Sequence, residues 1–259
     1  MTANSQPFNP NQRLAGQTAV ITGGSSGIGY AVAQALVAEG CSVVITGRNE
    51  EKLKTAAAKL AATAPGSVHV VPHICDVREP YSVDALFDMV QIRFGRVDIL
   101  FNNAGISQAP TSVEQTSVEM WREMVDINLN GVFLCTRAAL PLMSRGSTII
   151  NNLSAAAKQV FPNFAAYTAA KTGAYGFTLS LRDELMPRGI RVTALMPGAT
   201  STDIWQQIMP DASREGMMDV DTIAEAALYT VLLPPGANVA ELFITPTAGA
   251  IAADVNPKS

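Results

Sequence analysis

Short apolar runs alternate with longer amphipathic segments along most of the chain. Seven runs have the length and apolar character of buried strands: 18–22, 42–46, 68–74, 97–101, 148–153, 190–195 and 241–245. Helix-length segments occur between or after them at 27–39, 50–62, 80–94, 118–143, 165–186 and 220–233. Continuous apolar strands separated by helices are typical of a parallel sheet that helices cover on both faces. The pattern therefore predicts a three-layer α/β fold.

Several residues mark where the predicted helices begin and end. Gly40 follows the segment 27–39, at the position that glycine favours after a helix. Asn49 can cap the N-terminus of the next helix through its side-chain oxygen. Pro141 lies late in the segment 118–143, and we expect it to bend or end that helix because proline lacks a backbone N–H group.

The chain shows no linker and no shift in composition that would divide it. We therefore expect a single domain over residues 14–259, preceded by a flexible tail over residues 1–13. The first residues are polar and lack the basic, apolar and cleavage regions of a secretory signal. No apolar run reaches the roughly 18 residues that a membrane helix needs. We expect a cytoplasmic protein without a membrane partner.

Composition narrows the class of partner. The 259 residues are 48% hydrophobic and 15% charged, which allows a large buried core. The net charge of −4 comes without a basic cluster, and this argues against a nucleic-acid surface and in favour of small-molecule partners. Cys41, Cys75 and Cys135 lie far apart without metal-ligand spacing. We expect buried thiols in a reducing compartment and no metal site.

A glycine-rich loop joins the first predicted strand to the first predicted helix. It reads Thr22-Gly23-Gly24-Ser25-Ser26-Gly27-Ile28-Gly29. Small residues let the backbone turn sharply and approach a pyrophosphate, while the helix N-terminus supplies free N–H groups. The loop lacks the Gly-Lys-Ser/Thr ending of a P-loop, so a dinucleotide is favoured over a nucleoside triphosphate. The expected cofactor contacts in the loop are Gly23, Ser25, Ser26, Gly27, Ile28 and Gly29.

A tyrosine and a lysine lie four residues apart on the predicted helix over 165–186. Tyr167 and Lys171 should leave the same face of that helix, which places a phenol beside an ammonium group. The positive charge favours the phenolate and is expected to lower the tyrosine pKa, which would make the phenol a usable acid–base catalyst. Such pairs are also common on ordinary amphipathic helices, so other motifs must decide.

Three motifs together resemble the short-chain dehydrogenase/reductase family. They are Thr-Gly-x-x-x-Gly-x-Gly in the glycine-rich loop, Asn102-Asn103-Ala104-Gly105 after the fourth strand, and Tyr167-x-x-x-Lys171. The resemblance covers residues 14 to 249 and implies a Rossmann-type, doubly wound sheet of seven parallel strands. It also implies an oxidoreductase that interconverts a carbonyl and an alcohol, assembled as a homodimer or homotetramer through the helices over 118–143 and 165–186.

The resemblance assigns four catalytic positions. Ser154 lies 13 residues before Tyr167 and is expected to hydrogen-bond the substrate carbonyl oxygen. Tyr167 is implied to be the acid in reduction and the base in oxidation. Lys171 is implied to lower the Tyr167 pKa and to hold the nicotinamide ribose. Asn128 is implied to hold a water that links Lys171 to solvent. Leu153 departs from the family, which often has a second serine there, without an expected effect on the chemistry.

Further cofactor contacts follow from the resemblance. Asp76 and Val77 resemble the pair that contacts adenine. Asn103, Ala104 and Gly105 are expected to line the cofactor cleft. The run that resembles the nicotinamide carboxamide segment contains Pro197, Gly198, Thr200 and Thr202. All these positions follow predicted strands, where open α/β sheets bind ligands.

The end of the second strand favours NADP over NAD. Gly47 occupies the place where an acidic residue would accept hydrogen bonds from the ribose 2′-hydroxyl of NAD. Arg48 follows it and could pair with a 2′-phosphate, with Ser25 and Ser26 as additional donors. The alternative is that Arg48 is a solvated loop residue.

The region over 202–220 resembles the family's substrate lid. Its apolar residues are Ile204, Trp205, Ile208, Met209, Met217 and Met218, and it also holds Asp203 and Asp211. They suggest a pocket for an apolar or aromatic ketone or alcohol, or else they cover the core or a subunit contact. The chain over 241–249 lacks the Asp-Gly-Gly ending of acyl-carrier-protein reductases, which disfavours a role in fatty-acid synthesis.

Two other functions stay open. A non-catalytic NADP-binding sensor or scaffold could share the fold, but it would need no acid–base tyrosine, whereas Asn128, Ser154, Tyr167 and Lys171 are all present. A Rossmann-like methyltransferase could also share the glycine-rich loop. The Tyr167–Lys171 pair and the Asn-Asn-Ala-Gly segment argue against it.

Overall fold

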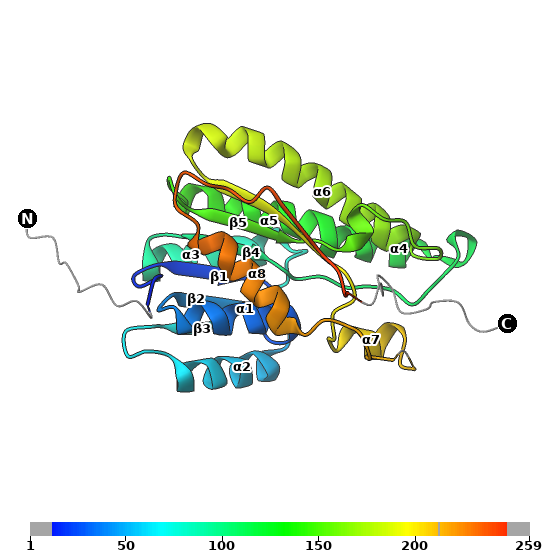
Figure 1. The fold of residues 1–259 in the computed structure, drawn as a ribbon, viewed down its shortest axis with the longest axis horizontal. Coiled ribbons are helices and arrows are strands. Elements are labelled where there is room, and N and C mark those ends of the chain that lie inside the picture. Colours follow the sequence, from blue (N-terminus) through cyan, green and yellow to red (C-terminus); the bar gives the residue numbers. More distant parts are fainter. Residues whose placement is uncertain (1–11, 212, 248–259) are drawn as a thin grey trace, which may run out of the picture.

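The computed structural model describes residues 12–211 and 213–247, and its centre is a seven-stranded parallel sheet (Figure 1). The strands are β1 (Thr18–Ile21), β2 (Ser42–Gly47), β3 (Val70–Ile74), β4 (Ile99–Asn102), β5 (Thr148–Asn152), β6 (Arg191–Pro197) and β7 (Glu241–Ile244). Their order is β3-β2-β1-β4-β5-β6-β7, and every neighbouring pair is parallel. The sheet confirms the predicted fold class.

Within the described part of the chain, eight α-helices accompany the sheet (Figure 1). They are α1 (Gly27–Ala38), α2 (Glu50–Thr63), α3 (Pro80–Phe94), α4 (Val118–Val125), α5 (Gly131–Ala139), α6 (Ala165–Leu185), α7 (Ile204–Ile208) and α8 (Val220–Leu232). α1, α2 and α8 pack on one face of the sheet, and α3, α5 and α6 pack on the other. The protein therefore has the three layers that the sequence predicts.

Alternate residues of each strand point to opposite faces and form two apolar layers. Ile21 and Ile45 belong to the layer shared with α1 and α8. Val20 and Val44, one position earlier, belong to the layer shared with α3 and α5. All four side chains are fully buried. Because both faces are covered, the strands are continuous apolar runs rather than alternating ones.

The order of the strands reverses between β1 and β4. From β1 the chain moves outward to β2 and β3, and then returns to place β4 on the other side of β1. The connections after β1 and β4 therefore diverge and leave a crevice at the carboxyl ends of these strands, where open α/β sheets bind ligands. The glycine-rich loop and the segment around Asn103 both lie at this point.

The prediction of one continuous helix over 118–143 is wrong. The structure divides this stretch into α4, a π-helical turn over Asp126–Asn130, α5 and a 3₁₀ turn over Leu140–Leu142. The side-chain nitrogen of Asn128 donates to the carbonyl oxygens of Met124 and Ile106, at 3.1 and 3.0 Å. The interruption thus involves a contact with a distant loop, and π turns often occur at functional sites.

Other predicted helix boundaries agree with the structure. α5 ends at Ala139, and Pro141 lies in the 3₁₀ turn that follows, as expected of a residue that ends a helix. The side-chain oxygen of Asn49 accepts a hydrogen bond from the backbone N–H group of Lys52 at 2.9 Å, so it caps α2. The short helix α7, within the lid, was not predicted.

Parts of the predicted tail and of the predicted C-terminal segment lie outside the described residues. Of the tail over 1–13, only the last two residues are described, and Arg13 forms an ion pair with Glu39 at the end of α1. Leu14 is buried. At the other end, residues 248–249 are not among those described. Within the described ranges, no helix is long and apolar enough to cross a membrane.

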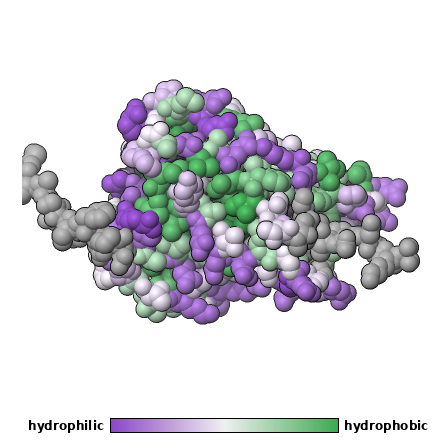
Figure 2. Space-filling model, in the orientation of Figure 1, coloured by the Kyte–Doolittle hydropathy of each residue, from purple (hydrophilic) through white to green (hydrophobic). Residues whose placement is uncertain are grey.

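One face of the molecule carries apolar side chains around α8 and the edge strand β7. Figure 2 shows apolar residues across the middle of this face, with hydrophilic residues around them. Phe243 of β7 and Tyr229 of α8 are 43% and 58% exposed.

Candidate active site

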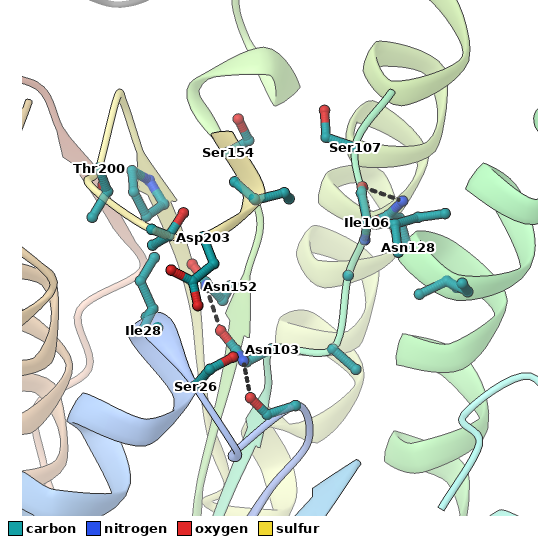
Figure 3. Close-up of a pocket in the computed structure, with 18 of the residues that line it drawn as sticks. Ser26, Ile28, Asn103, Ile106, Ser107, Asn128, Asn152, Ser154, Thr200 and Asp203 are labelled. Carbon is teal, nitrogen blue, oxygen red and sulfur yellow. Dashed lines mark hydrogen bonds between the residues drawn. The ribbon is translucent and has the colours of Figure 1, made fainter. Parts of the chain in front are cut away.

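A cavity of about 820 Å³ opens at the carboxyl ends of the strands. It brings together every site residue predicted from the sequence except Gly29. Figure 3 shows Ser26 and Ile28 at the start of α1, Asn103 after β4, and Ser154 after β5 around this space. A cavity of this volume at the crevice of an open α/β sheet is large enough for an extended ligand.

The glycine-rich loop turns tightly between β1 and α1. Gly23 and Gly27 have φ values of 65° and 54°, in the left-handed region that favours glycine. Gly29 does not line the cavity, but a Cβ atom there would lie 2.4 Å from the carbonyl oxygen of Gly23. Gly29 therefore allows α1 to pack closely against the loop, so that the helix N-terminus is directed at the cavity.

Asn103 joins the ends of β1, β4 and β5 through hydrogen bonds (Figure 3). Its side-chain nitrogen donates to the carbonyl oxygens of Thr22 and Gly23, at 3.0 and 3.2 Å. Its side-chain oxygen accepts from the side-chain nitrogen of Asn152 at 2.8 Å. The hydroxyl oxygen of Thr22 accepts from the backbone N–H groups of Asn103 and Ala104, both at 2.9 Å. Three strand ends are thereby held in one arrangement.

Ser154, Tyr167 and Lys171 all line the cavity. The hydroxyl oxygen of Ser154 accepts from the backbone N–H group of Ala156 at 3.1 Å, which starts a 3₁₀ turn directly after β5. α6 carries Tyr167 and Lys171 on one face, and Lys171 Nζ lies 5.7 Å from the centre of the Tyr167 ring. The predicted helical spacing therefore brings the phenol and the amine into the same site.

Lys171 is a buried amine. Lys171 is only 6% exposed, and its Nζ donates to the carbonyl oxygen of Asn152 at 3.2 Å. Burial lowers the pKa of Lys171 to about 8, because the ammonium form loses its hydration. An amine with such a pKa can gain or lose a proton close to neutral pH.

The pKa of Tyr167 moves in the direction opposite to the prediction. Burial raises the pKa of its phenol, while the Ser154 hydroxyl acts more weakly to lower that pKa. The expected lowering by Lys171 is wrong because desolvation of the phenolate outweighs any attraction to an ammonium group that Asn152 already holds. The raised pKa keeps the phenol protonated at neutral pH.

Asn128 is fully buried in the π turn between α4 and α5. Its side-chain oxygen accepts from the N–H group of Ile106 at 3.3 Å, and its side-chain nitrogen donates to the Ile106 carbonyl oxygen at 3.0 Å. A Cβ atom on Gly105 would lie 2.8 Å from that Asn128 oxygen and 3.5 Å from Lys171 Nζ. Asn128 therefore fixes the loop after β4 close to Lys171. The water relay remains a prediction.

Basic and hydroxyl side chains meet beside the end of β2. Arg48 lines the cavity together with Ser25 and Ser26, as predicted. Lys52, in the first turn of α2, also lines it and was missed in the sequence. Its place in the first turn of the helix that Asn49 caps, directly after the end of β2, is the signal that could have indicated it.

Asp76 lies after β3 and lines the same end of the cavity as Val77. Arg78 donates to the Asp76 carboxylate through Nε at 3.0 Å and through Nη2 at 2.6 Å. These bonds hold the pKa of Asp76 below its usual value, and the charge of Arg48 acts in the same direction. Because Arg78 compensates the carboxylate, Arg48 and Lys52 leave this end of the cavity favourable for an anion.

The segment after β6 is hydrogen-bonded to the lid. Thr200 forms an isolated parallel bridge with Met218. The indole N–H group of Trp205 donates to the carbonyl oxygen of Thr200 at 2.8 Å, and Arg214 donates to the carbonyl oxygen of Thr202 at 2.7 Å. The residues predicted to contact the nicotinamide are therefore linked to the start and the end of the lid.

The two interpretations of the lid apply to different residues. Ile204, Trp205 and Ile208 line the cavity, whereas Met209, Met217 and Met218 are not among its lining residues. Met218 instead packs against the apolar layer shared by α1 and α8. The aliphatic and indole side chains of α7 thus face the cavity, and this methionine covers the core.

The lining residues that were not singled out from the sequence include four in irregular loops. Ile106 and Ser107 follow β4, and Phe161 and Phe164 lie in the turn before α6. Figure 3 shows the Ser107 hydroxyl in the same part of the site as Ser154. No periodicity or motif marks these positions, because each lies in an irregular loop whose path depends on tertiary contacts.

Comparison with known proteins gives consistent matches across most of the chain. A family model described as short chain dehydrogenase matches residues 17–213. An uncharacterised oxidoreductase of Staphylococcus aureus (strain MRSA252) is 36% identical over 235 residues, which cover 90% of this chain and 98% of that protein.

Solved structures resemble the fold closely. An alcohol dehydrogenase from the archaeon Thermococcus sibiricus, complexed with 5-hydroxy-NADP, has a TM-score of 0.82 and 31% identity, covering 89% of this chain and 97% of that chain. A 3-ketoacyl-(acyl-carrier-protein) reductase from Brucella melitensis, complexed with NADH, has a TM-score of 0.81 and 30% identity, covering 90% of this chain and 98% of that chain.

Proposed function

Because the chain belongs to the short-chain dehydrogenase family and is an oxidoreductase of CH–OH and C=O groups, we propose that it interconverts a ketone or aldehyde and an alcohol with NADP(H). The observation that carries the proposal is the meeting of Ser154, Tyr167 and Lys171 at one cavity that also contains the glycine-rich loop. A bound NADP(H) would supply or accept the hydride.

The described residues fit such a cofactor. The glycine-rich loop and the N-terminus of α1 form a cradle for a pyrophosphate. The side-chain oxygens of Thr46 and Asn152 belong to lining residues, are buried, and have no hydrogen-bond partner among the described residues. Buried polar atoms of this kind usually have partners, so the two unsatisfied oxygens in residues that line the cavity are consistent with a polar ligand.

The chain's own residues would handle the proton. In reduction, the Tyr167 hydroxyl donates its proton to the carbonyl oxygen, and its raised pKa keeps it protonated beforehand. Ser154 donates a hydrogen bond to the same oxygen and stabilises the charge that develops there. Lys171, with its pKa lowered to about 8, then acts beside Tyr167 as the group that can restore the proton.

Preference for NADP over NAD rests on the basic residues beside β2. A 2′-phosphate could pair with Arg48 and Lys52 and accept hydrogen bonds from Ser25 or Ser26. Gly47, in the position of a ribose-binding acid, offers no carboxylate that would repel the phosphate. Asp76 is already compensated by Arg78.

Steady-state kinetics with both cofactors tests this proposal. We expect kcat/KM for NADPH to exceed that for NADH by about tenfold or more, and Arg48→Ala to remove most of the difference by weakening NADPH alone. Lys59→Ala, which changes an exposed residue of α2 away from the cavity, is the control. A preference for NADH would overturn the NADP assignment, and a lack of turnover of any carbonyl or alcohol with either cofactor would overturn the proposed reaction.

We also propose a homodimer or homotetramer that uses the outer surface of α4, α5 and α6. Val118 and Trp121 of α4 and Phe133 of α5 are large apolar residues that are 57%, 45% and 45% exposed. Exposed apolar side chains grouped on neighbouring helices are typical of a contact surface. Light scattering on the purified protein measures the mass, and a monomer at micromolar concentration would contradict the proposal.

A further inference from the structure

One side of the cavity is lined by apolar side chains from three separate segments. Ile106 follows β4, Phe161 and Phe164 precede α6, and Ile204, Trp205 and Ile208 belong to α7. We call these six residues the apolar wall. The two phenylalanines lie in the stretch between Ser154 and Tyr167, so the wall continues from the residues that would handle the carbonyl group.

Most of the apolar wall lies outside the apolar clusters that pack between the sheet and its helices. Phe161, Phe164, Trp205 and Ile208 belong to none of the apolar clusters found among the described residues. Phe164 and Ile208 are nevertheless only 9% exposed, and both face the cavity. Large apolar side chains that line a cavity without joining a core layer offer binding area to a ligand.

The cationic side chains that line the cavity belong to other segments than the apolar wall. Arg48, Lys52 and Asp76 belong to the end beside β2 and β3, and Lys171 is buried with Nζ bonded to a backbone oxygen. The lid contributes Asp203, which Figure 3 shows on the side of Ser26 and Ile28, away from Ser154. Among the described lining residues, no cation belongs to the three segments of the apolar wall, and Asp203 adds a negative charge beside α7.

We propose that the apolar wall binds the bulky hydrocarbon part of an uncharged ketone or of the corresponding secondary alcohol. This inference rests on the proposed function of the same site. A carboxylate placed against the wall would lose hydration without gaining a cationic partner, so charged keto acids are disfavoured. A small ketone would reach Ser154 and Tyr167 but leave most of the wall without contacts.

The hydrogen bond from Trp205 to the carbonyl oxygen of Thr200 gives the wall a second effect. Thr200 belongs to the segment proposed to contact the nicotinamide, and the bond length is 2.8 Å. A hydrocarbon group packed against the Trp205 ring would therefore stabilise the lid in the position that also holds this segment. Binding of the ketone and of the cofactor should strengthen each other.

Three ketones that differ in one property each test the proposal. Cyclohexyl methyl ketone is bulky and neutral, acetone is small and neutral, and 4-acetylcyclohexanecarboxylate is bulky and anionic. With NADPH, we expect kcat/KM for the first to exceed that for each of the others by at least about tenfold. Equal values for the neutral and the anionic bulky ketone, or for the bulky ketone and acetone, would overturn the proposal.

Substitutions in the wall separate its contribution from that of the reacting groups. Phe161→Ala and Ile208→Ala should each lower kcat/KM for cyclohexyl methyl ketone by about tenfold and that for acetone by no more than about twofold. Val160→Ala is the matched control, because Val160 is next to Phe161 in sequence but 84% exposed and outside the cavity lining. Parallel losses with both ketones would contradict a role in binding the hydrocarbon part.

A measurement of ketone binding tests the apolar wall even if the protein turns over no ketone. The chain has two tryptophans, so Trp121→Phe leaves Trp205 as the remaining indole fluorophore. We expect a saturable change in its fluorescence with cyclohexyl methyl ketone and a much weaker one with the carboxylate analogue. Binding without turnover would overturn the proposed reaction but support the wall, whereas turnover without such selectivity would overturn the wall alone.

Discussion

The cofactor half and the proposed substrate half of the cavity are built from different kinds of contact. Around the glycine-rich loop, Asn103 and Thr22 make side-chain hydrogen bonds to backbone groups of neighbouring strand ends. In the other half, the five-residue helix α7 depends on bonds such as those from Trp205 and Arg214 to single carbonyl oxygens. The cofactor half is held directly by the ends of the strands. The substrate half is connected to the sheet through loops.

This difference suggests why the two halves are suited to different tasks. A dinucleotide is the same molecule in every reaction, so its cradle benefits from a fixed geometry with no space for additional atoms. The apolar wall offers area and shape instead, and residues in loops can be replaced without disturbing the sheet. Ser154 and Tyr167 lie where the two halves meet, so the proposed cofactor and ketone would bind on opposite sides of them.

The largest expected effect concerns the proton donor at this junction. Tyr167→Phe should lower kcat by about 10²–10⁴-fold, the range typical of a lost general acid, while the dissociation constant for NADPH changes by no more than about twofold. Stopped-flow turnover and fluorescence titration measure the two quantities. Tyr175→Phe on the same helix is the control, because that phenol bonds to Glu241 outside the cavity. Turnover equal to that of the unmodified protein would contradict the acid–base assignment.

Adding a single methyl group at Gly29 should disturb the packing of the cofactor half. Gly29→Ala should lower the free energy of unfolding by about 1–3 kcal/mol and weaken NADPH binding, because the added Cβ would approach the Gly23 carbonyl oxygen to 2.4 Å. Gly66→Ala is the control, since a Cβ there would meet no atom within 4 Å. Urea unfolding at one protein concentration measures the stability of both variants, and fluorescence titration measures their NADPH binding. Equal stability of the two variants would show that the loop tolerates displacement.

A smaller effect should appear in the pH dependence of stability. The pKa of Lys171 is lowered to about 8 by burial, against about 10.4 for an unfolded lysine. Between these values the unfolded chain binds more protons, so this residue makes the free energy of unfolding rise with pH, by up to about 1.4 kcal/mol per pH unit. This gain in the free energy of unfolding begins near pH 8, the folded pKa, and is complete above about pH 10.4, the unfolded pKa.

Lys171→Met provides the comparison for that measurement. Urea unfolding of the two proteins between pH 8 and 9.5 should give a more positive slope of the free energy of unfolding against pH for the unmodified protein than for the variant. The buried cysteines, whose pKa values are raised, contribute equally to both slopes. Parallel curves would mean that Lys171 has an ordinary pKa in the folded state. Restricting the window to values below pH 10 avoids the titration of tyrosines, including Tyr167 with its raised pKa.

The sequence specifies the cofactor half better than the substrate half, for physical reasons. The glycine-rich loop, Asn103 and the strand ends follow from local backbone requirements and from the alternation of apolar runs, which a sequence displays directly. Lys52 was missed although it lies in the first turn of the helix that follows β2, next to the predicted site. The π turn around Asn128 could not be predicted, because its side-chain bond to Ile106 joins segments that only the fold brings together.

The apolar wall shows the limit of pattern-based prediction. Phe161 and Phe164 occur in an irregular turn, so no period distinguishes an apolar residue that faces a cavity from one that covers the core. In the lid, Trp205 and Met218 look equally apolar in sequence, yet the structure directs the first to the cavity and the second to the core. The Tyr167 pKa was misjudged for a related reason, because burial depends on the whole surrounding structure.

Transfer of deuterium from [4-²H]NADPH to the product tests the central claim most directly. The two stereospecifically labelled forms of the cofactor would each be incubated with cyclohexyl methyl ketone, and the alcohol analysed by mass spectrometry. We expect one form to place a single deuterium on the carbinol carbon, and Tyr167→Phe to slow this transfer by about 10²–10⁴-fold. Alcohol formed without deuterium from either form, or no alcohol from any ketone tested, would contradict hydride transfer at this site.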